Sequence, residues 1–238
     1  EAEELVVHEL GDGRFRLGEQ QLADVDVVEQ FALVVDDVDP VDGLGVVAVL
    51  ADLLDGAGDR VAIAMRNYPE WMLIYWACAC SGIAVVGMNA WWTAEEMEYA
   101  LADSKPKVLF LDQERLARVR ERPSMASTMT LVGVRLESDE KDVTPWRDVI
   151  ARQAGLPEIG IDPESDACIF YTSGTTGFPK GAQLTHRGCV SNLMNMLYAR
   201  ASTALAVMEA TGEAPPDPPP VPVTLINTPL FHVTANNC

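Results

Sequence analysis

Residues 171–181 read YTSGTTGFPKG, a run of hydroxyl side chains and glycines with a single lysine near its end. Such a loop has no apolar face to bury, but it offers backbone N–H groups, hydroxyl donors and one cation to a polyanion. A strand-like segment, 167–171, precedes it, and a short alternating segment, 181–184, follows it. We therefore predict a phosphate-binding loop between two strands. Its candidate residues are Thr172, Ser173, Gly174, Thr175, Thr176, Gly177 and Lys180.

The spacing of the glycines differs from that of the common phosphate-binding loop, G-x-x-x-x-G-K-[ST]. The glycine after Gly174 comes only three residues later, and Pro179 and Gly181 flank the lysine. An ordinary kinase or GTPase loop is therefore disfavoured. Two alternatives stay open from the residues alone: a polar surface turn, which short loops of this composition often form, and a buried structural salt bridge as the role of Lys180.

The composition of the chain indicates a globular protein. Its 238 residues are 48% hydrophobic and include five tryptophans, enough to build one large core or two small ones. A net charge of -19 argues against nucleic-acid binding, because phosphate backbones select basic surfaces. The five cysteines contain no C-x-x-C pair, and Cys78 and Cys80 lie in an apolar helical run, so we interpret them as reduced core residues rather than as a disulfide framework or a zinc site.

One apolar segment imitates a membrane span. Residues 71–94 carry no charge and are long enough to cross a bilayer. Ser81, Gly82 and Gly87 interrupt the segment, and its pattern changes from that of a buried helix to that of a buried strand. We therefore expect no transmembrane segment. The amino terminus, EAEE, lacks the basic and apolar regions of a signal peptide, so we expect a cytoplasmic location.

Helical and strand-like patterns alternate along most of the chain. Thr93 and Glu96 form the capping-box pattern at one helix start, and Thr144 and Thr185 are expected to cap two later helices. The alternation predicts an α/β fold with mostly parallel sheets flanked by helices on both faces. The expected helices span 46–54, 69–80, 93–101, 113–122, 144–153 and 187–210, and the expected strands span 61–65, 83–86, 108–111, 130–136 and 223–227.

We divide the chain into three parts. Residues 1–44 form an acidic, poorly defined segment, residues 45–165 an α/β subdomain, and residues 166–238 the truncated start of a second α/β subdomain that carries the predicted loop. Within the first part, residues 36–43 do not place their carboxylates at the spacing of a calcium-binding loop, which favours a solvated acidic loop.

The predicted loop closely resembles the signature of the adenylate-forming superfamily, approximately [YF]-[TS]-S-G-[TS]-T-G-x-P-K-G, and meets every fixed position. Two further stretches resemble segments of that family. Residues 58–63 and 67–71 read GDRVAI and NYPEW, and residues 228–233 read TPLFHV. The motifs follow the family's order and cover roughly residues 45–238. The resemblance implies the amino-terminal portion of an acyl-CoA synthetase, with the corresponding fold.

The resemblance also implies an activity, that of an ATP-dependent carboxylate:CoA ligase using ATP, Mg²⁺ and coenzyme A. Such an enzyme joins a carboxylate to the α-phosphate of ATP, releases pyrophosphate, and lets the coenzyme A thiol displace AMP. By resemblance the loop binds the β- and γ-phosphates, Lys180 supplies positive charge, and His232 lines the acyl pocket. The segment around His232 resembles fatty-acid ligases more than aryl-acid ligases. For His186, at a helix start, we expect a capping or packing role.

The family's members are longer than this chain. The family's adenine pocket, magnesium-binding loop and carboxy-terminal domain with its catalytic lysine are absent from residues 1–238. We therefore expect little or no ligase activity from the chain alone. A non-catalytic binding or assembly module that retains the fold is one alternative, and a different ATP-using phosphotransferase is another. We also consider a homodimer, because an exposed sheet edge promotes self-association.

Overall fold

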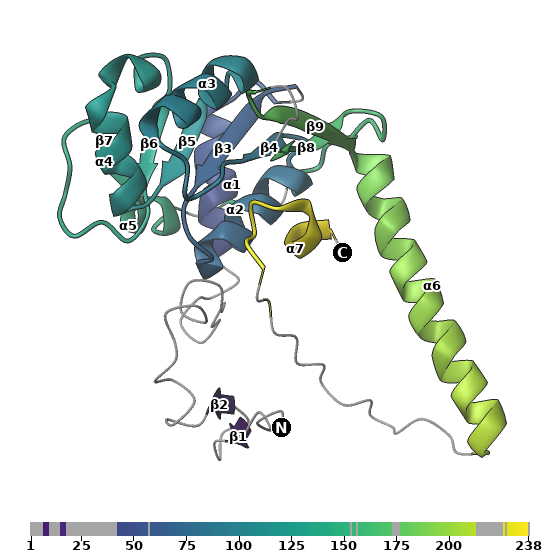
Figure 1. The fold of residues 1–238 in the computed structure, drawn as a ribbon. Coiled ribbons are helices and arrows are strands. Elements are labelled where there is room, and N and C mark those ends of the chain that lie inside the picture. Colours follow the sequence, from purple (N-terminus) through teal and green to yellow (C-terminus); the bar gives the residue numbers. More distant parts are fainter. Residues whose placement is uncertain are drawn as a thin grey trace.

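A seven-stranded sheet forms the centre of the computed structural model, which describes residues 7–9, 15–17, 42–56, 58–152, 154–155, 157–172, 177–212, 226 and 228–237 (Figure 1). The strand order is β7-β6-β5-β3-β4-β8-β9, and every neighbouring pair is parallel except β8 and β9, which are antiparallel. The strands are β3 (Arg60–Ala64), β4 (Ala84–Gly87), β5 (Val108–Leu111), β6 (Thr130–Gly133), β7 (Val143–Pro145), β8 (Asp166–Thr172) and β9 (Lys180–Thr185).

Helices cover both faces of this sheet. One hydrophobic cluster joins α1, α2 and α5 to one face, and a second cluster joins α3 and α4 to the other face. The predicted α/β fold with a mostly parallel sheet and flanking helices is therefore confirmed. The helices are α1 (Asp42–Leu53), α2 (Pro69–Cys80), α3 (Ala94–Ser104), α4 (Gln113–Glu121), the 3₁₀-helix η2 (Pro123–Ala126), α5 (Trp146–Ile150), α6 (His186–Thr211) and α7 (Val233–Asn237).

The central strands are buried on both sides, which explains their continuous apolar sequences. In β3, Val61 and Ile63 face the first cluster, whereas Ala62 and Ala64 face the second. Side chains alternate across a strand, so a strand that is covered on both faces has no polar side. All four residues of β5 are fully buried for the same reason.

Two of the three predicted helix caps are present. The side chain of Thr93 accepts a hydrogen bond from the backbone N–H of Glu96, whose carboxylate accepts from the Thr93 N–H, so the capping box is complete. The Thr185 side chain accepts from Gly188 N–H at the start of α6. The prediction for Thr144 is wrong. Thr144 pairs with Val132 as part of β7, and α5 starts after Pro145, because a β-branched residue also suits a strand.

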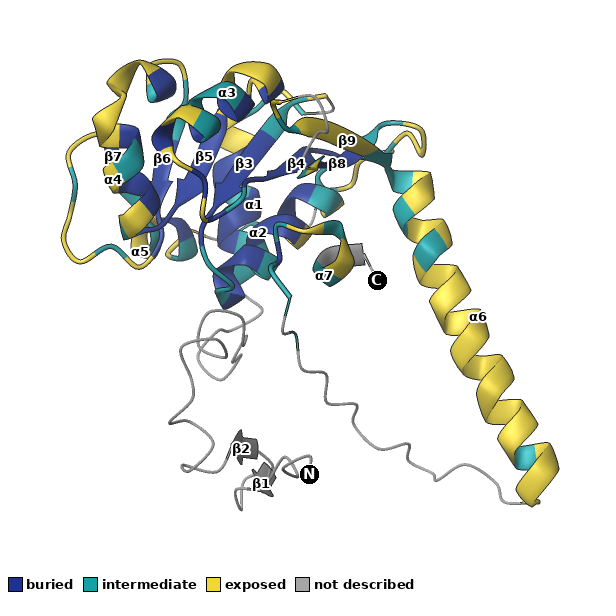
Figure 2. Ribbon diagram, viewed as in Figure 1, coloured by how far each residue is buried: buried dark blue, intermediate teal, exposed yellow. Residues whose placement is uncertain are grey.

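The long helix α6 differs from the others, because none of its 26 residues is buried. Figure 2 shows it leaving the sheet with almost its whole length exposed. The apolar residues that recur along it therefore do not pack into the described part of the molecule. Its exposed large apolar side chains are Val190, Leu193, Met194, Met196, Leu197, Tyr198, Leu205 and Val207.

The remaining expectations concern the chain ends and the domain division. A small antiparallel sheet pairs β1 (Val7–Glu9) with β2 (Phe15–Leu17), and the rest of residues 1–41 lies outside the described residues, as does most of the strand expected at 223–227. The division at 165/166 stays a prediction. The sheet itself runs across that point, because β8 pairs with β4. Every helix in the described part of the chain is too short or too polar to cross a membrane.

Candidate functional site

The carboxyl ends of β4 and β8 lie side by side, because Gly87 pairs with Phe170 in a parallel ladder. The chain leaves β8 at Thr172 and enters the predicted phosphate loop, so the loop starts at the same edge of the sheet where β4 ends. In open α/β sheets, ligands bind in the crevice outside the carboxyl ends of the strands. The topology therefore places the predicted loop where this fold class binds ligands.

The predicted loop joins two paired strands. Thr172 and Lys180 are partners in the β8–β9 ladder, and the Thr172 hydroxyl lies 3.4 Å from the Lys180 carbonyl oxygen, to which it donates. The Lys180 side chain is exposed and makes no ion pair with any other residue that the structure describes, unlike a buried structural salt bridge. Gly177 has a φ of +116°, a conformation that side chains strain to adopt. Residues 173–176, which include the predicted Ser173, Gly174, Thr175 and Thr176, lie outside the described residues.

Two aromatic side chains attach both ends of the loop to α3. Before the loop, the Tyr171 hydroxyl donates a hydrogen bond of 2.7 Å to the Asp103 carboxylate. After it, the ring of Phe178 stacks on Tyr99, with 4.6 Å between the ring centroids. Burial and the hydrogen bond to Asp103 raise the pKa of Tyr171, so its hydroxyl stays protonated and keeps donating. The loop is therefore held at its two ends by one helix.

The segment that carries His232 docks on the same edge of the sheet. The Asn67 side chain donates to the Thr228 carbonyl oxygen at 2.8 Å and accepts from the Leu230 N–H at 2.8 Å. Leu230 is fully buried. His232 itself is exposed, and its Nδ1 accepts a hydrogen bond from the Thr234 N–H at 3.3 Å. A bidentate amide thus fixes the backbone just before the histidine and leaves the ring at the surface.

Gly87 is the point where this segment approaches the end of β4 most closely. A Cβ placed on Gly87 would lie 3.2 Å from the Phe231 carbonyl oxygen and 2.9 Å from carbons of the Phe170 ring. Only glycine therefore fits without displacing a neighbour. The Phe231 ring also meets Trp91 edge-to-face, with 5.2 Å between the centroids. The segment that carries His232 consequently packs against the ends of β4 and β8.

A buried ionic cluster fixes the backbone after β4. The Arg115 side chain is fully buried, and its Nη1 lies 2.9 Å from an oxygen of Asp112. Its Nε donates to the Ala90 carbonyl oxygen at 2.8 Å, and Arg118 donates to the same oxygen at 2.7 Å. Two arginines of α4 therefore fix the backbone directly before Trp91. Buried charges of this kind are tolerated when paired and hydrogen-bonded.

Comparison with known proteins agrees with this geometry. The family profile described as "AMP-binding enzyme" matches residues 48–238, well over half of the chain. The chain belongs to the AMP-binding enzyme family. Members of this family are AMP-forming acid–thiol ligases and related adenylate-forming enzymes.

The curated relatives of this AMP-binding chain are longer than it is. Feruloyl-CoA synthase of Amycolatopsis sp is 34% identical over 194 residues, which are 79% of this chain and 33% of that protein. 4-Coumarate–CoA ligase 2 of Oryza sativa subsp. japonica is 29% identical over 158 residues, 61% of this chain and 28% of that protein. The chain thus spans about a third of the length of these relatives.

Solved structures share the fold. The anthranilate CoA ligase AuaEII in complex with anthranoyl-AMP superposes with a TM-score of 0.60 at 24% identity, over 70% of this chain and 34% of that one. The fatty acyl CoA synthetase of Mycobacterium tuberculosis gives a TM-score of 0.54 at 23% identity, over 65% and 30% of the two chains. At these identities the likeness supports the fold alone.

Several residues of this edge escaped the sequence analysis. Asn67 begins the NYPEW stretch, but nothing in the sequence indicates that its amide binds the backbone of Thr228, 161 residues away. Tyr99 looks like an ordinary helical residue until Phe178 stacks on it. Gly87 had a usable signal, since a glycine directly after a buried strand often marks a close backbone approach.

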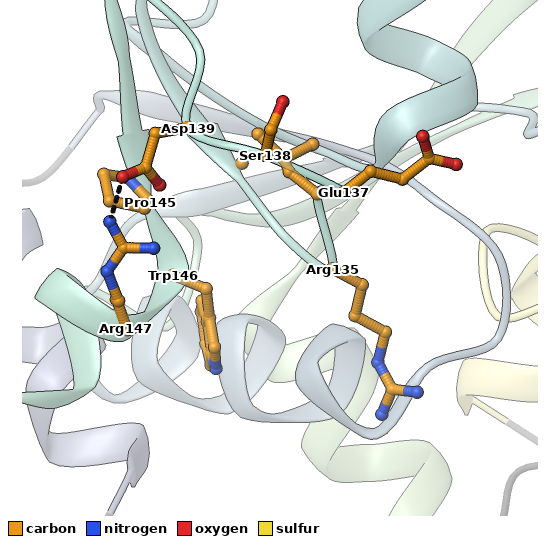
Figure 3. Close-up of a pocket in the computed structure, with 9 residues that line it drawn as sticks. Arg135, Glu137, Ser138, Asp139, Pro145, Trp146 and Arg147 are labelled. Atoms are coloured by element: carbon orange, nitrogen blue, oxygen red, sulfur yellow. Dashed lines mark hydrogen bonds and ion pairs between the residues drawn. The ribbon is translucent and has the colours of Figure 1, made fainter.

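A hollow at the ends of β6 and β7 is a poorer candidate for the functional site. It has a volume of about 200 Å³ and is drawn in Figure 3. Arg147 at its rim pairs with Asp139 at 2.5 Å, and Arg135 pairs with Glu70 at 2.9 Å and lies over the Tyr68 ring. Both guanidinium groups therefore already face carboxylates, which leaves them poorly suited to an anionic ligand.

Proposed function

We propose that the protein containing this chain is an ATP-dependent carboxylate:CoA ligase, which forms an acyl-adenylate with release of pyrophosphate and then an acyl-CoA with release of AMP. One observation carries the proposal: in a member of the AMP-binding family, the strand that leads into the signature loop and the segment that carries His232 both lie at the carboxyl ends of β4 and β8. Positioning two reactants at one edge of a rigid sheet supplies much of the rate in such transfers.

The proposed role of the loop is to bind the triphosphate. A carboxylate and a polyphosphate repel each other, so the site must supply donors and positive charge where they meet. The exposed Lys180 ammonium and the hydroxyl groups of the loop suit that task, and the anchoring of Tyr171 and Phe178 on α3 keeps the two ends of the loop in place. The proposed nucleotide-binding residues are Thr172, Ser173, Gly174, Thr175, Thr176, Gly177 and Lys180.

The proposed role of His232 is to orient the carboxylic acid. Its exposed ring stands next to Phe231, which rests against the end of β4. For Mg²⁺, no group of three or more His, Cys, Asp or Glu side chains gathers as a metal site in the described ranges. We propose that Mg²⁺ bridges phosphate oxygens, as this hard cation usually does in nucleotide sites.

The proposed carboxylic acid substrate covers two classes, fatty acids and aryl acids. The motif around His232 favours a fatty acid, whereas two of the relatives are named for ferulate and coumarate, so a substrate panel must contain both kinds of acid. A cytoplasmic location and a homodimer remain part of the proposal.

The test is pyrophosphate release from ATP with a panel of fatty, aryl and short-chain acids, on the chain and on a version extended past Cys238. We expect no turnover by the chain alone and acid-dependent release by the extended version. Lys180→Ala and Thr175→Ala should each lower the rate of release by about a hundredfold, whereas Lys141→Ala removes an exposed lysine elsewhere and should leave the rate unchanged. A folded, extended protein that releases nothing with any acid would support the binding-module alternative, and ADP as product would support a phosphotransferase.

A further inference from the structure

Two cysteine sulfurs that are 21 residues apart in the chain lie next to each other near the base of the β8–β9 hairpin. The Sγ atoms of Cys168 and Cys189 are 4.0 Å apart. Cys168 lies in β8 and is fully buried, and Cys189 lies near the start of α6 and is partly exposed. A disulfide bond is about 2 Å long, so the two sulfurs need to approach by only about 2 Å to form one.

A third side chain completes this site. The Tyr75 side chain, from α2, packs in the same hydrophobic cluster as Cys168 and Cys189. Burial, together with the two nearby sulfurs, raises the pKa of Tyr75, so its hydroxyl stays protonated and remains a donor. The contact with the Cys168 thiol and, less strongly, the nearby Tyr75 hydroxyl lower the pKa of Cys189 to about 7 against the effect of burial. The positive end of the α6 dipole favours a thiolate in the same place.

The other cysteines that the structure describes are placed differently. Cys78 is fully buried in the core, and burial raises the pKa of its thiol, which makes it unreactive. Cys80 is exposed at the end of α2, so the prediction that it lies in the core is wrong, because the last residue of the helix extends past the layer that covers the sheet. Cys189 therefore combines access to solvent, donors that stabilise its thiolate and a second thiol within reach, the combination that characterises redox-sensitive cysteines.

We propose that Cys168 and Cys189 form a peroxide-sensitive dithiol that closes to an intramolecular disulfide. The Cys189 thiolate attacks one oxygen of hydrogen peroxide, and hydroxide leaves to give a sulfenic acid. Cys168 then gives up its proton, and its sulfur attacks the sulfenic sulfur, which expels a second hydroxide. The two hydroxides leave as two waters with the two thiol protons, so the two thiols are oxidised and one peroxide is reduced.

The disulfide would tie the start of α6 to the middle of β8. The closed loop contains the whole β8–β9 hairpin and with it the predicted phosphate loop. A cross-link of this kind constrains the unfolded chain, so the oxidised protein should melt about 5 °C higher than the reduced one. Because thiol chemistry is the readout, the inference stands or falls independently of any ligase activity.

The experiment treats the full chain with a small excess of hydrogen peroxide, blocks the remaining thiols with iodoacetamide, and maps peptides by mass spectrometry without reduction. We expect a peptide linking Cys168 to Cys189, loss of both of these thiols, and full recovery of both with dithiothreitol. Cys80→Ser should give the same link. Cys189→Ser should abolish it, and Cys168→Ser should leave a sulfenic acid at Cys189 that dimedone traps.

The peptide map of the peroxide-treated wild-type chain tests the proposal even if a variant at the buried Cys168 fails to fold. Both thiols intact after peroxide treatment that oxidises the exposed Cys80 would overturn the proposal. Links that involve other cysteines, or links between chains, in place of the 168–189 peptide would overturn it equally.

Discussion

The apolar side chains of the central sheet are buried, whereas those of the helix α6 are not. In β5, each residue is fully buried between two layers of helices, whereas α6 is 26 residues long and buries none of them. The sheet is thus stabilised by contacts that the described residues supply themselves. The apolar side chains of α6 find no such contacts among the described residues. Stability in this chain should therefore depend on the sheet and hardly at all on α6.

The largest expected difference between the sheet and α6 comes from two matched substitutions that shorten a side chain to alanine. Phe110→Ala removes a fully buried ring in β5 and should lower the free energy of unfolding by about 4 kcal/mol. Leu197→Ala removes a side chain that is 52% exposed in α6 and should change it by less than about 0.5 kcal/mol. Urea unfolding followed by tryptophan fluorescence measures both. Similar losses of unfolding free energy in the two variants would contradict the claim that stability depends on the sheet and hardly on α6.

A second test addresses the charges buried beneath the sheet edge. Arg115→Met leaves the buried Asp112 carboxylate without its main partner and should cost about 3 kcal/mol of stability. Arg120→Met, on the exposed side of the same helix, should cost almost nothing, since the hydrogen bond to the Lys141 carbonyl oxygen is the only polar interaction of Arg120 among the described residues. Chemical denaturation of the two variants side by side checks this. The double variant Asp112→Asn with Arg115→Met should recover part of the loss.

The third test concerns the close approach at Gly87. Adding a Cβ there forces either the Phe170 ring or the Phe231 backbone to move, and Gly87→Ala should cost about 2 kcal/mol. Gly155→Ala is the control, because a Cβ at Gly155 meets nothing within 4 Å. Thermal melts of both proteins give the comparison. A neutral Gly87→Ala would mean that the His232 segment does not rest against β4.

The smallest expected effect comes from the two helix caps. Thr93→Ala removes the capping box of α3, which packs on the sheet, and should lower the stability of the sheet by about 1 kcal/mol. Thr185→Ala removes the equivalent cap of α6 and should leave the unfolding midpoint of the sheet unchanged while reducing helical circular dichroism. Equal shifts of the midpoint would show that α6 unfolds together with the sheet.

The parts of the fold that sequence predicted well are those that local rules determine. The alternating pattern, the start of α2 at Pro69, the caps at Thr93 and Thr185 and the strands on either side of the loop depend on residues close in the chain, and the structure has all of them. Thr144 was misassigned because capping and strand formation compete for the same residue type.

The parts that sequence did not predict depend on distant contacts. The approach of Asn67 to Leu230 joins residues 163 apart, and no local pattern encodes it. The burial of Arg115 was missed because an arginine in a polar helix is normally exposed. The apolar spacing in α6 correctly predicted a helix, but periodicity alone does not say what covers the apolar side chains.

The most direct test of the proposed site is acid-dependent pyrophosphate release by the extended protein, compared between the Lys180→Ala and Lys141→Ala variants. We expect release with at least one acid, a loss of about a hundredfold in Lys180→Ala because a charge at the phosphates is gone, and an unchanged rate in Lys141→Ala. Equal rates in the two lysine variants, or no release with any acid by a folded protein, would contradict the assignment of this sheet edge as the adenylate-forming site.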